Sequence, residues 1–275
     1  MPDVRPHARP RAVPEAQTQT RPYRLALVLP DIHNPHEDKK AVAGVERYAA
    51  DESWDYWICL GDLLDNDAIS AFNAGKPRKL MAAPTVKEQF DYTNVFLDRH
   101  LQAVKAKSPN VECVLIEGNH EERTERYCDG RPELEGIVDV AEGLRLKERG
   151  IRYVRFWSKG ESYKLGKLTC IHGAYTPQNH AAKHVRDYGT SLVYGHVHDA
   201  QQFSVKLKGS GKPLSAWSIG CLCRLDLDYM RGRPHNWIHA FAVVYIFPDG
   251  NFQLTTVPIV GGRFVGPTNG RVYNG

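Results

Sequence analysis

The chain has 275 residues, of which 42% are hydrophobic, and carries a formal net charge of +4 at pH 7. This length allows one large domain or two small ones, and the apolar content supports a real core. No apolar run reaches membrane-spanning length and the N-terminus lacks the apolar centre of a secretory signal. We therefore expect a cytoplasmic protein with no membrane partner.

The net charge is unevenly distributed along the chain. Residues 1–24 hold five arginines against two acidic residues, a net +3, which leaves +1 for the rest. Residues 1–22 are rich in Pro, Arg, Gln and Thr, and we expect a disordered arm there, with a basic anchor for nucleic acid or a partner as the alternative. Residues 23–275 are expected to form a single domain, and their near-neutral charge argues against a dedicated nucleic-acid binder.

The first half of the chain alternates between predicted strands and helices. Continuous apolar runs predict strands covered on both faces over 25–29, 56–60 and 111–116. Amphipathic patterns predict helices over 39–50 and 85–107, and a helix from near His120 toward Tyr127. We also expect a short broken helix over 67–80, and a helix over 132–149 within a segment, 131–150, that could form a partial cap.

The second half is richer in strands. Its patterns predict strands over 151–156, 161–165, 168–171, 191–194, 202–207, 214–219, 238–247 and 252–259. One helix is expected to start at Thr176, with Pro177 at its first position, and to end near Gly189.

The six cysteines show no pattern of disulfides or of a zinc-type C-x-x-C site. Cys59, Cys113 and Cys170 lie in apolar strand-like runs, Cys128 stands alone, and the C-x-C pair near residue 222 has no partner pair. We expect six reduced thiols in a reducing compartment.

A metal-binding residue type follows directly after five of the predicted strands. In chain order these residues are Asp31 and His33, then Asp62, then Asn119 and His120, then His172, then His196 and His198. If the strands lie side by side, these side chains gather at one edge of a sheet, where open α/β sheets bind ligands. A single such His is more often structural, but five coincidences together favour a metal site.

The candidate ligands are carboxylates, an amide and imidazoles, with no thiolate. This mixture suits Mn, Fe, Co, Ni or Zn rather than copper(I) or an iron–sulfur cluster. Seven ligands, the set above without His120, are too many for one tetrahedral zinc but fit two divalent ions about 4 Å apart, bridged by a carboxylate. Asp62 is the natural bridge, and we expect Mn to serve well in vitro.

The motifs that carry these residues resemble, in order, those of the calcineurin-like metallophosphoesterases. They are Asp31-Ile32-His33, Gly61-Asp62-Leu63-Leu64-Asp65, Gly118-Asn119-His120-Glu121, His172-Gly173 and Gly195-His196-Val197-His198. The resemblance spans residue 25 to about 200. It implies an α/β/β/α sandwich, in which two mixed sheets are flanked by helices and a dinuclear metal site lies at one edge.

The resemblance also implies a role for each motif residue. One metal would be held by Asp31, His33, Asp62 and His198, and the other by Asp62, Asn119, His172 and His196. A water bridging the two metals would attack phosphorus in line. His120 would donate a proton to the leaving oxygen, and Asp65 would orient the His120 ring.

Departures from the family pattern bear on the substrate. Asn66 stands where the protein Ser/Thr phosphatases of this family carry an Arg, so one positively charged, phosphate-binding side chain is missing. The pattern looks more like small bacterial and phage phosphoesterases. We therefore expect a phosphodiesterase acting on a nucleotide or small phosphodiester, with no obligate protein partner evident. A nuclease on DNA or RNA ends, a phosphomonoesterase and a non-catalytic scaffold of the same fold remain open.

Substrate contacts are less well defined by sequence. Asn34, His36, Arg123 and His180 are candidates, and each has a structural alternative in loop stabilisation, packing or plain solvation. His180 and His184 lie four residues apart on one helix face, which leaves a third metal site or simple packing as interpretations.

Overall fold

The computed structural model describes residues 21–70, 73, 83–134, 138–206, 211–227 and 234–275. Most of the expected arm over 1–22, and most of the broken helix over 67–80, lie outside the described residues; only the 3₁₀ turn Asp67–Ile69 is seen of the latter. Among the described residues, no helix is long and apolar enough to span a membrane, and all six cysteines are free.

A six-stranded mixed sheet forms the first half of the sandwich, with strand order β11-β10-β1-β2-β3-β4. Its strands are β1 (Arg24–Leu29), β2 (Tyr56–Cys59), β3 (Glu112–Ile116), β4 (Ile151–Val154), β10 (Ala240–Ile246) and β11 (Phe252–Pro258). Strands β1 to β4 run parallel, and β10 pairs antiparallel with β1. Strands β1, β2 and β3 are buried on both faces apart from the first residues of β1 and β3, as their sequence indicated, whereas β4 carries the exposed Arg152.

A five-stranded mixed sheet forms the second half, with strand order β5-β6-β7-β9-β8. Its strands are β5 (Tyr163–Leu165), β6 (Leu168–Cys170), β7 (Leu192–Tyr194), β8 (Ala200–Lys206) and β9 (Pro213–Ile219). Strand β7 is parallel to both β6 and β9. The carboxyl ends of β6 and β7 therefore meet at one edge.

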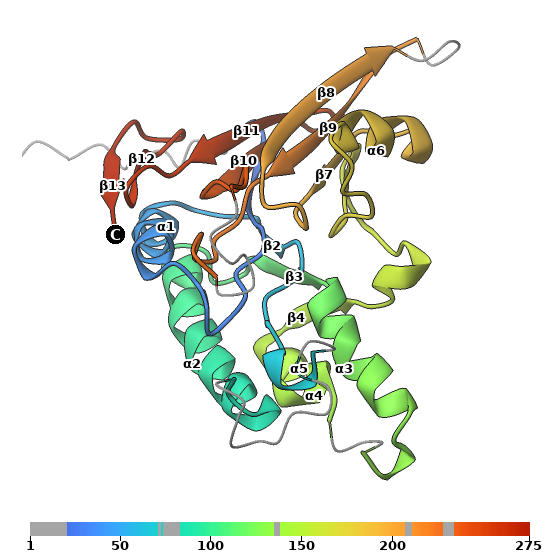
Figure 1. Ribbon diagram of the computed structural model, residues 1–275. Coiled ribbons are helices and arrows are strands. Elements are labelled where there is room, and N and C mark those ends of the chain that lie inside the picture. The colour runs from blue at the N-terminus through green and yellow to red at the C-terminus, as the bar shows by residue number, and fades with distance from the viewer. Residues whose placement is uncertain (1–20, 71–72, 74–82, 135–137, 207–210, 228–233) are drawn as a thin grey trace, which may run out of the picture.

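Helices cover the outer faces of the two sheets. Helices α1 (Lys39–Asp51) and α2 (Val86–Lys105) pack beside each other on the six-stranded sheet, whereas α6 (His180–Tyr188) lies on the five-stranded sheet, far from them (Figure 1). Both α1 and α2 begin with a side-chain cap, from Asp38 and from Thr85, which satisfies free backbone N–H groups.

Three apolar cores separate these layers. Val28, Ile58 and Val114 of the first sheet pack against Leu165 and Val193 of the second. A second core joins the other face of the first sheet to α1 and α2, and a third joins the second sheet to α6. The predicted α/β/β/α sandwich is therefore confirmed.

Three segments differ from the sequence expectation. The helix expected to start at Thr176 starts instead at His180, with Asn179 as its N-cap. In place of one helix over 132–149, the described residues form a 3₁₀ turn (Pro132–Leu134), α4 (Val140–Gly143) and α5 (Leu146–Arg149). Arg145 adopts a left-handed conformation, with φ of 48°, and this interrupts the helical run. The sequence also gave no sign of the C-terminal hairpin of β12 (Arg263–Val265) and β13 (Val272–Asn274), which packs on α1.

Candidate metal centre

The candidate metal ligands come from both sheets and lie where the strands end. Asp31, Asp62 and Asn119 follow β1, β2 and β3 of the first sheet, while His172 and His196 follow β6 and β7 of the second. Ligand atoms from these loops lie within 4.8 Å of one another in two adjoining groups. The two sheets thus contribute to one site.

The first group of ligand atoms combines Asp31, His33, Asp62 and His198, all buried and within 4.8 Å of one another. His198 Nε2 lies 3.3 Å from Asp31 Oδ1 and 3.2 Å from His33 Nε2. His33 Nε2 lies 3.6 Å from Asp62 Oδ2. These four are the residues that the motif resemblance assigned to one metal.

The second group combines Asp62, His172 and His196. His172 Nε2 lies 3.3 Å from Asp62 Oδ2, 3.1 Å from His196 Nδ1 and 3.0 Å from Asn119 Oδ1. Asp62 Oδ2 thus faces both groups. Asn119 and His196 are half-buried, whereas Asp62 and His172 are buried, so the site opens to solvent on the Asn119 side.

The nitrogen and oxygen lone pairs in both groups face each other. His33 Nδ1 is bonded to an Asp65 carboxylate oxygen at 2.8 Å, and His172 Nδ1 to the Leu60 carbonyl at 2.9 Å. An Nδ1 that donates leaves Nε2 as a lone pair in the neutral ring, and in His172 this lone pair points at the acceptor oxygen of Asp62. Such an arrangement needs a positive charge between the facing lone pairs. The nitrogen and oxygen ligand atoms of each group therefore fit a divalent cation.

The pKa values of two of the imidazoles, His172 and His198, are raised, which shows that their surroundings favour added positive charge. Burial opposes protonation of His172, but the Asp62 carboxylate outweighs it and raises the pKa to about 9. Burial likewise opposes protonation of His198, yet Cys223 and Asp31 raise its pKa to about 10. Burial and the neighbouring His172 lower the pKa of His196 to about 4.

Five of the proposed ligand residues adopt left-handed backbone conformations. Their φ values are 38° at Asp31, 54° at His33, 49° at Asp62, 69° at His196 and 66° at His198. Residues other than glycine rarely adopt this region, and such strain clusters at functional sites. The loops are shaped to aim these side chains at one point.

Two glycines allow the ligand loops to approach closely. A Cβ atom on Gly118 would lie 2.2 Å from Asp62 Oδ1, and one on Gly195 would lie 1.9 Å from Asp31 Oδ2. Any side chain at these positions would displace a proposed ligand carboxylate. The motif glycines are therefore required by space at the site.

Glu121 holds the Asp62 loop and the start of α3 (Asn119–Asp129) together. Its buried carboxylate accepts hydrogen bonds of 2.9 Å from the backbone N–H groups of Asp62, Leu64 and Gly118. Burial and the nearby Asp62 raise the pKa of Glu121 to about 7. The sequence motif includes Glu121, but it does not indicate that this carboxylate joins the Asp62 loop to the start of α3.

His120 lies beside both groups, on the half-exposed side of the site. Its Nδ1 bonds the backbone carbonyl of Asp65 at 2.7 Å, while the Asp65 carboxylate is 3.3 Å away and bonds His33 more closely. Arg123 bonds the same carbonyl at 2.9 Å and lies 3.3 Å from His120 Nε2. Burial opposes the charge on His120, but Asp62 and Asp65 raise its pKa.

The remaining predicted residues fall into different places. Asn34 is fully buried, and its side-chain amide has no hydrogen-bond partner among the described residues. His36 bonds Asp67 at 2.8 Å and lies 3.8 Å from the Asp65 carboxylate, at the margin of the site. Asn66 is buried and donates to the His120 carbonyl, so it ties the loop to α3.

His180 is not brought to the metal groups. Its ring nitrogens bond Tyr194 at 2.7 Å and Asp199 at 3.0 Å, and His184 bonds the backbone of Ala174 and of His180 itself. Both rings are thus occupied in holding α6 to its sheet.

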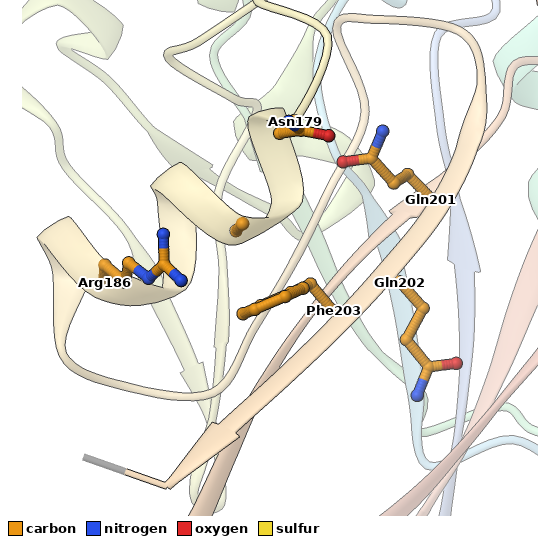
Figure 2. Close-up of a pocket in the computed structure, with 6 residues that line it drawn as sticks. Asn179, Arg186, Gln201, Gln202 and Phe203 are labelled. Atoms are coloured by element: carbon orange, nitrogen blue, oxygen red, sulfur yellow. The ribbon is translucent and has the colours of Figure 1, made fainter.

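A separate pocket of about 450 Å³ lies between α6 and β8. Figure 2 shows Asn179, just before α6, and Arg186 on α6 lying near Gln201 and Phe203 of β8, and none of the proposed ligands lines the pocket.

The fold and the site together define an α/β/β/α protein with two adjoining groups of oxygen and nitrogen ligands. A family model for the calcineurin-like phosphoesterases matches residues 25–200. The chain belongs to the calcineurin-like phosphoesterase family, and this places it among metal-dependent phosphoesterases.

Two curated relatives cover nearly the whole chain. The Gene 54 protein of Mycobacterium phage L5 is 25% identical over 262 residues, 90% of this chain and 97% of its own. The Gene 54 protein of Mycobacterium phage D29 is 24% identical over 253 residues, 86% of this chain and 94% of its own.

Solved structures resemble the chain more distantly. Vps29 of Entamoeba histolytica in complex with zinc has a TM-score of 0.42 and 16% identity, covering 91% of this chain and 97% of its own. The nuclease MPE of Pseudomonas putida has a TM-score of 0.38 and 18% identity, covering 90% of this chain and 86% of its own.

Proposed function

We propose that this protein hydrolyses phosphodiesters with two divalent metal ions, and that His120 donates the proton to the leaving oxygen. The observation that carries the proposal is the position of Asp62 Oδ2 between two complete ligand groups, with His120 Nε2 3.9 Å from the same oxygen. Bound divalent ions would supply positive charge for the phosphoryl oxygens and would acidify water.

The residues of this chain then have distinct tasks. His120 is fixed through Nδ1, and its Nε2, 3.3 Å from Arg123, is the nitrogen that would carry the proton to a leaving oxygen; its raised pKa keeps that proton available near neutral pH. Arg123, next to His120 Nε2, is placed to bind a phosphate oxygen. The half-exposed start of α3 adds a favourable dipole for an anion.

The preference for a diester rests on the charge available around the phosphate. Asn66 occupies the position directly after Asp65 and is buried against α3, so it offers no positive charge to a further anionic oxygen. A diester carries less negative charge than a monoester and needs fewer cations. Retention of every motif ligand and of His120 supports an enzyme rather than a non-catalytic scaffold.

Substrate preference and the role of His120 can be measured together. Purified protein with Mn, Ni, Zn or Mg is expected to hydrolyse bis-p-nitrophenyl phosphate faster than p-nitrophenyl phosphate. His120→Asn is expected to lower kcat by about 10²- to 10⁴-fold while its metal content stays at the wild-type level. Faster monoester hydrolysis would overturn the diester preference, and wild-type kcat in His120→Asn would remove the proton-donor role.

A further inference from the structure

Part of the metal centre is built by residues beyond those that match the family model, which end at residue 200. The connection between β9 and β10 returns to the site through Cys221, Leu222 and Cys223, all buried. Two further residues just before β10, Trp237 and Ile238, also reach it. The sequence patterns assigned no role to Cys223.

The backbone of this connection is bonded to the loop that follows β1. The N–H groups of Leu222 and Cys223 both donate to the Asp31 carbonyl at 3.0 Å. Arg224 N–H donates to the His36 carbonyl at 2.8 Å, and the Leu222 carbonyl accepts from Asp38 N–H at 2.8 Å. These bonds fix the strained backbone of Asp31, one of the proposed ligands.

The same segment surrounds His198 on the side away from the metal groups. While His198 Nε2 faces Asp31 and His33, its Nδ1 lies 3.7 Å from Cys223 Sγ. The His198 carbonyl accepts from Ile238 N–H at 2.9 Å, and the Trp237 ring packs edge-on with its centroid 4.2 Å away. No solvent reaches the thiol, because Cys223 is 0% exposed.

The second nitrogen of a metal-binding imidazole normally bonds a neighbour that sets the direction of the ring. His33 uses the Asp65 carboxylate and His172 uses the Leu60 carbonyl. In His198 this place is taken by the Cys223 thiol. We propose that Cys223 is a positioning residue, whose buried thiol holds His198 Nδ1 so that Nε2 points into the group formed with Asp31 and His33.

This inference rests on the proposed two-metal function and adds a prediction about one ion only. Cys223→Ala removes the partner of His198 Nδ1, and we expect the affinity for one of the two ions to fall by about 10- to 100-fold. The other ion, held by His172 and His196, should bind as in the wild type, because the thiol contacts neither ring. Cys223→Ser is expected to stay close to wild type, because a hydroxyl can also bond Nδ1.

Cys221→Ala is the matched control. It removes a thiol that is equally buried and only two residues away, but whose Sγ lies 3.6 Å from the Ile238 carbonyl and 4.0 Å from the Cys223 carbonyl. The experiment titrates Mn²⁺ into metal-free wild type, Cys223→Ala, Cys223→Ser and Cys221→Ala by calorimetry. Melting of each metal-free protein checks that the variant is folded.

The outcomes separate the two proposals. Two ions in the wild type and one weakened ion in Cys223→Ala, with Ser and the Cys221 control unaffected, is the expected result. Two equally tight ions in Cys223→Ala would overturn the role of Cys223 and leave the proposed function standing. Fewer than two ions in the wild type would overturn both. If Cys223→Ala does not fold, the test uses Cys223→Ser. Equal weakening of both ions in Cys223→Ser would contradict the proposal, and binding of both ions as in the wild type would support it.

Discussion

At the scale of single residues, the proposed metal centre contains five of the eight non-glycine residues with positive φ among the described residues. A left-handed L-residue costs roughly 1–2 kcal/mol, and five proposed ligands adopt it. Asp is among the residue types that tolerate this region best, and each ligand loop is held from outside by bonds such as those from Glu121 to the Asp62 loop. The ligand directions are therefore set by the fold before any ion binds.

Asp62 and Asp31 should differ sharply when each is replaced by alanine. Asp62 Oδ2 faces both ligand groups, whereas Asp31 belongs only to the group with His33 and His198. We expect Asp62→Ala to abolish tight binding of both ions and Asp31→Ala to weaken mainly one. Metal content after gel filtration, measured by mass spectrometry, tests this; two retained ions in Asp62→Ala would contradict a bridging role.

At the scale of secondary-structure elements, helix α3 connects the substrate side of the centre to its bridging carboxylate. Its first turn carries Asn119 and His120, and Gly118 caps it against the Asp62 loop. His120 N–H also donates to Asp62 Oδ1 at 3.0 Å. A shift of this helix would move the proton donor and the bridge together.

The two glycines that flank α3 provide a matched test of that close packing. Both have ordinary negative φ values, −97° at Gly118 and −88° at Gly130, so alanine causes no backbone strain at either. A Cβ on Gly118 would meet Asp62 Oδ1 at 2.2 Å, whereas one on Gly130 would meet no atom within 4 Å.

We expect Gly118→Ala to lower the free energy of unfolding by about 1–3 kcal/mol and to impair binding of both metals. Gly130→Ala should change neither. Urea unfolding and metal content check the pair, and equal behaviour of the two variants would show that the Asp62 contact has no consequence.

At the scale of the whole molecule, the sequence predicted the architecture well because its strands are regular. The runs near Val28, Ile58 and Val114 are continuous and apolar, so both the strands and the residues that follow them could be located. Alternation in strands cannot reveal which strands from distant parts of the chain become neighbours. The motif order supplied that information for residues up to about 200.

Other contacts at the site left no signal in the sequence. Asn34 was a candidate substrate contact, but a loop sequence does not show which face its side chain takes, and the residue is buried. Asp65 was expected to orient His120, but the sequence could not show that its backbone carbonyl, at 2.7 Å from His120 Nδ1, lies closer than its carboxylate, at 3.3 Å. Cys223 lies in a C-x-C pair for which the sequence predicted a reduced thiol and no role at a site.

Removal of bound metal should lower the melting temperature of the whole protein. Each ion that binds only the folded chain and is present at 100 times its Kd stabilises it by about 2.7 kcal/mol, which corresponds to about 5–10 °C per ion for a chain of this size. Wild type melted with Mn²⁺ and with excess chelator tests this, and Asp62→Ala should show no such difference. Equal melting temperatures of metal-loaded and chelated wild type would contradict linkage between the site and the fold.

The origin of the ligands in both sheets also sets when the centre can form during synthesis. His196 N–H bonds the Asp31 carboxylate across 165 residues of sequence. At about 5–20 residues per second, the ribosome needs on the order of ten seconds or more to make that stretch. Strand β7 and the histidines after it are made long after β1 and β2, so the proposed ligand groups are complete only once the second sheet has emerged and docked.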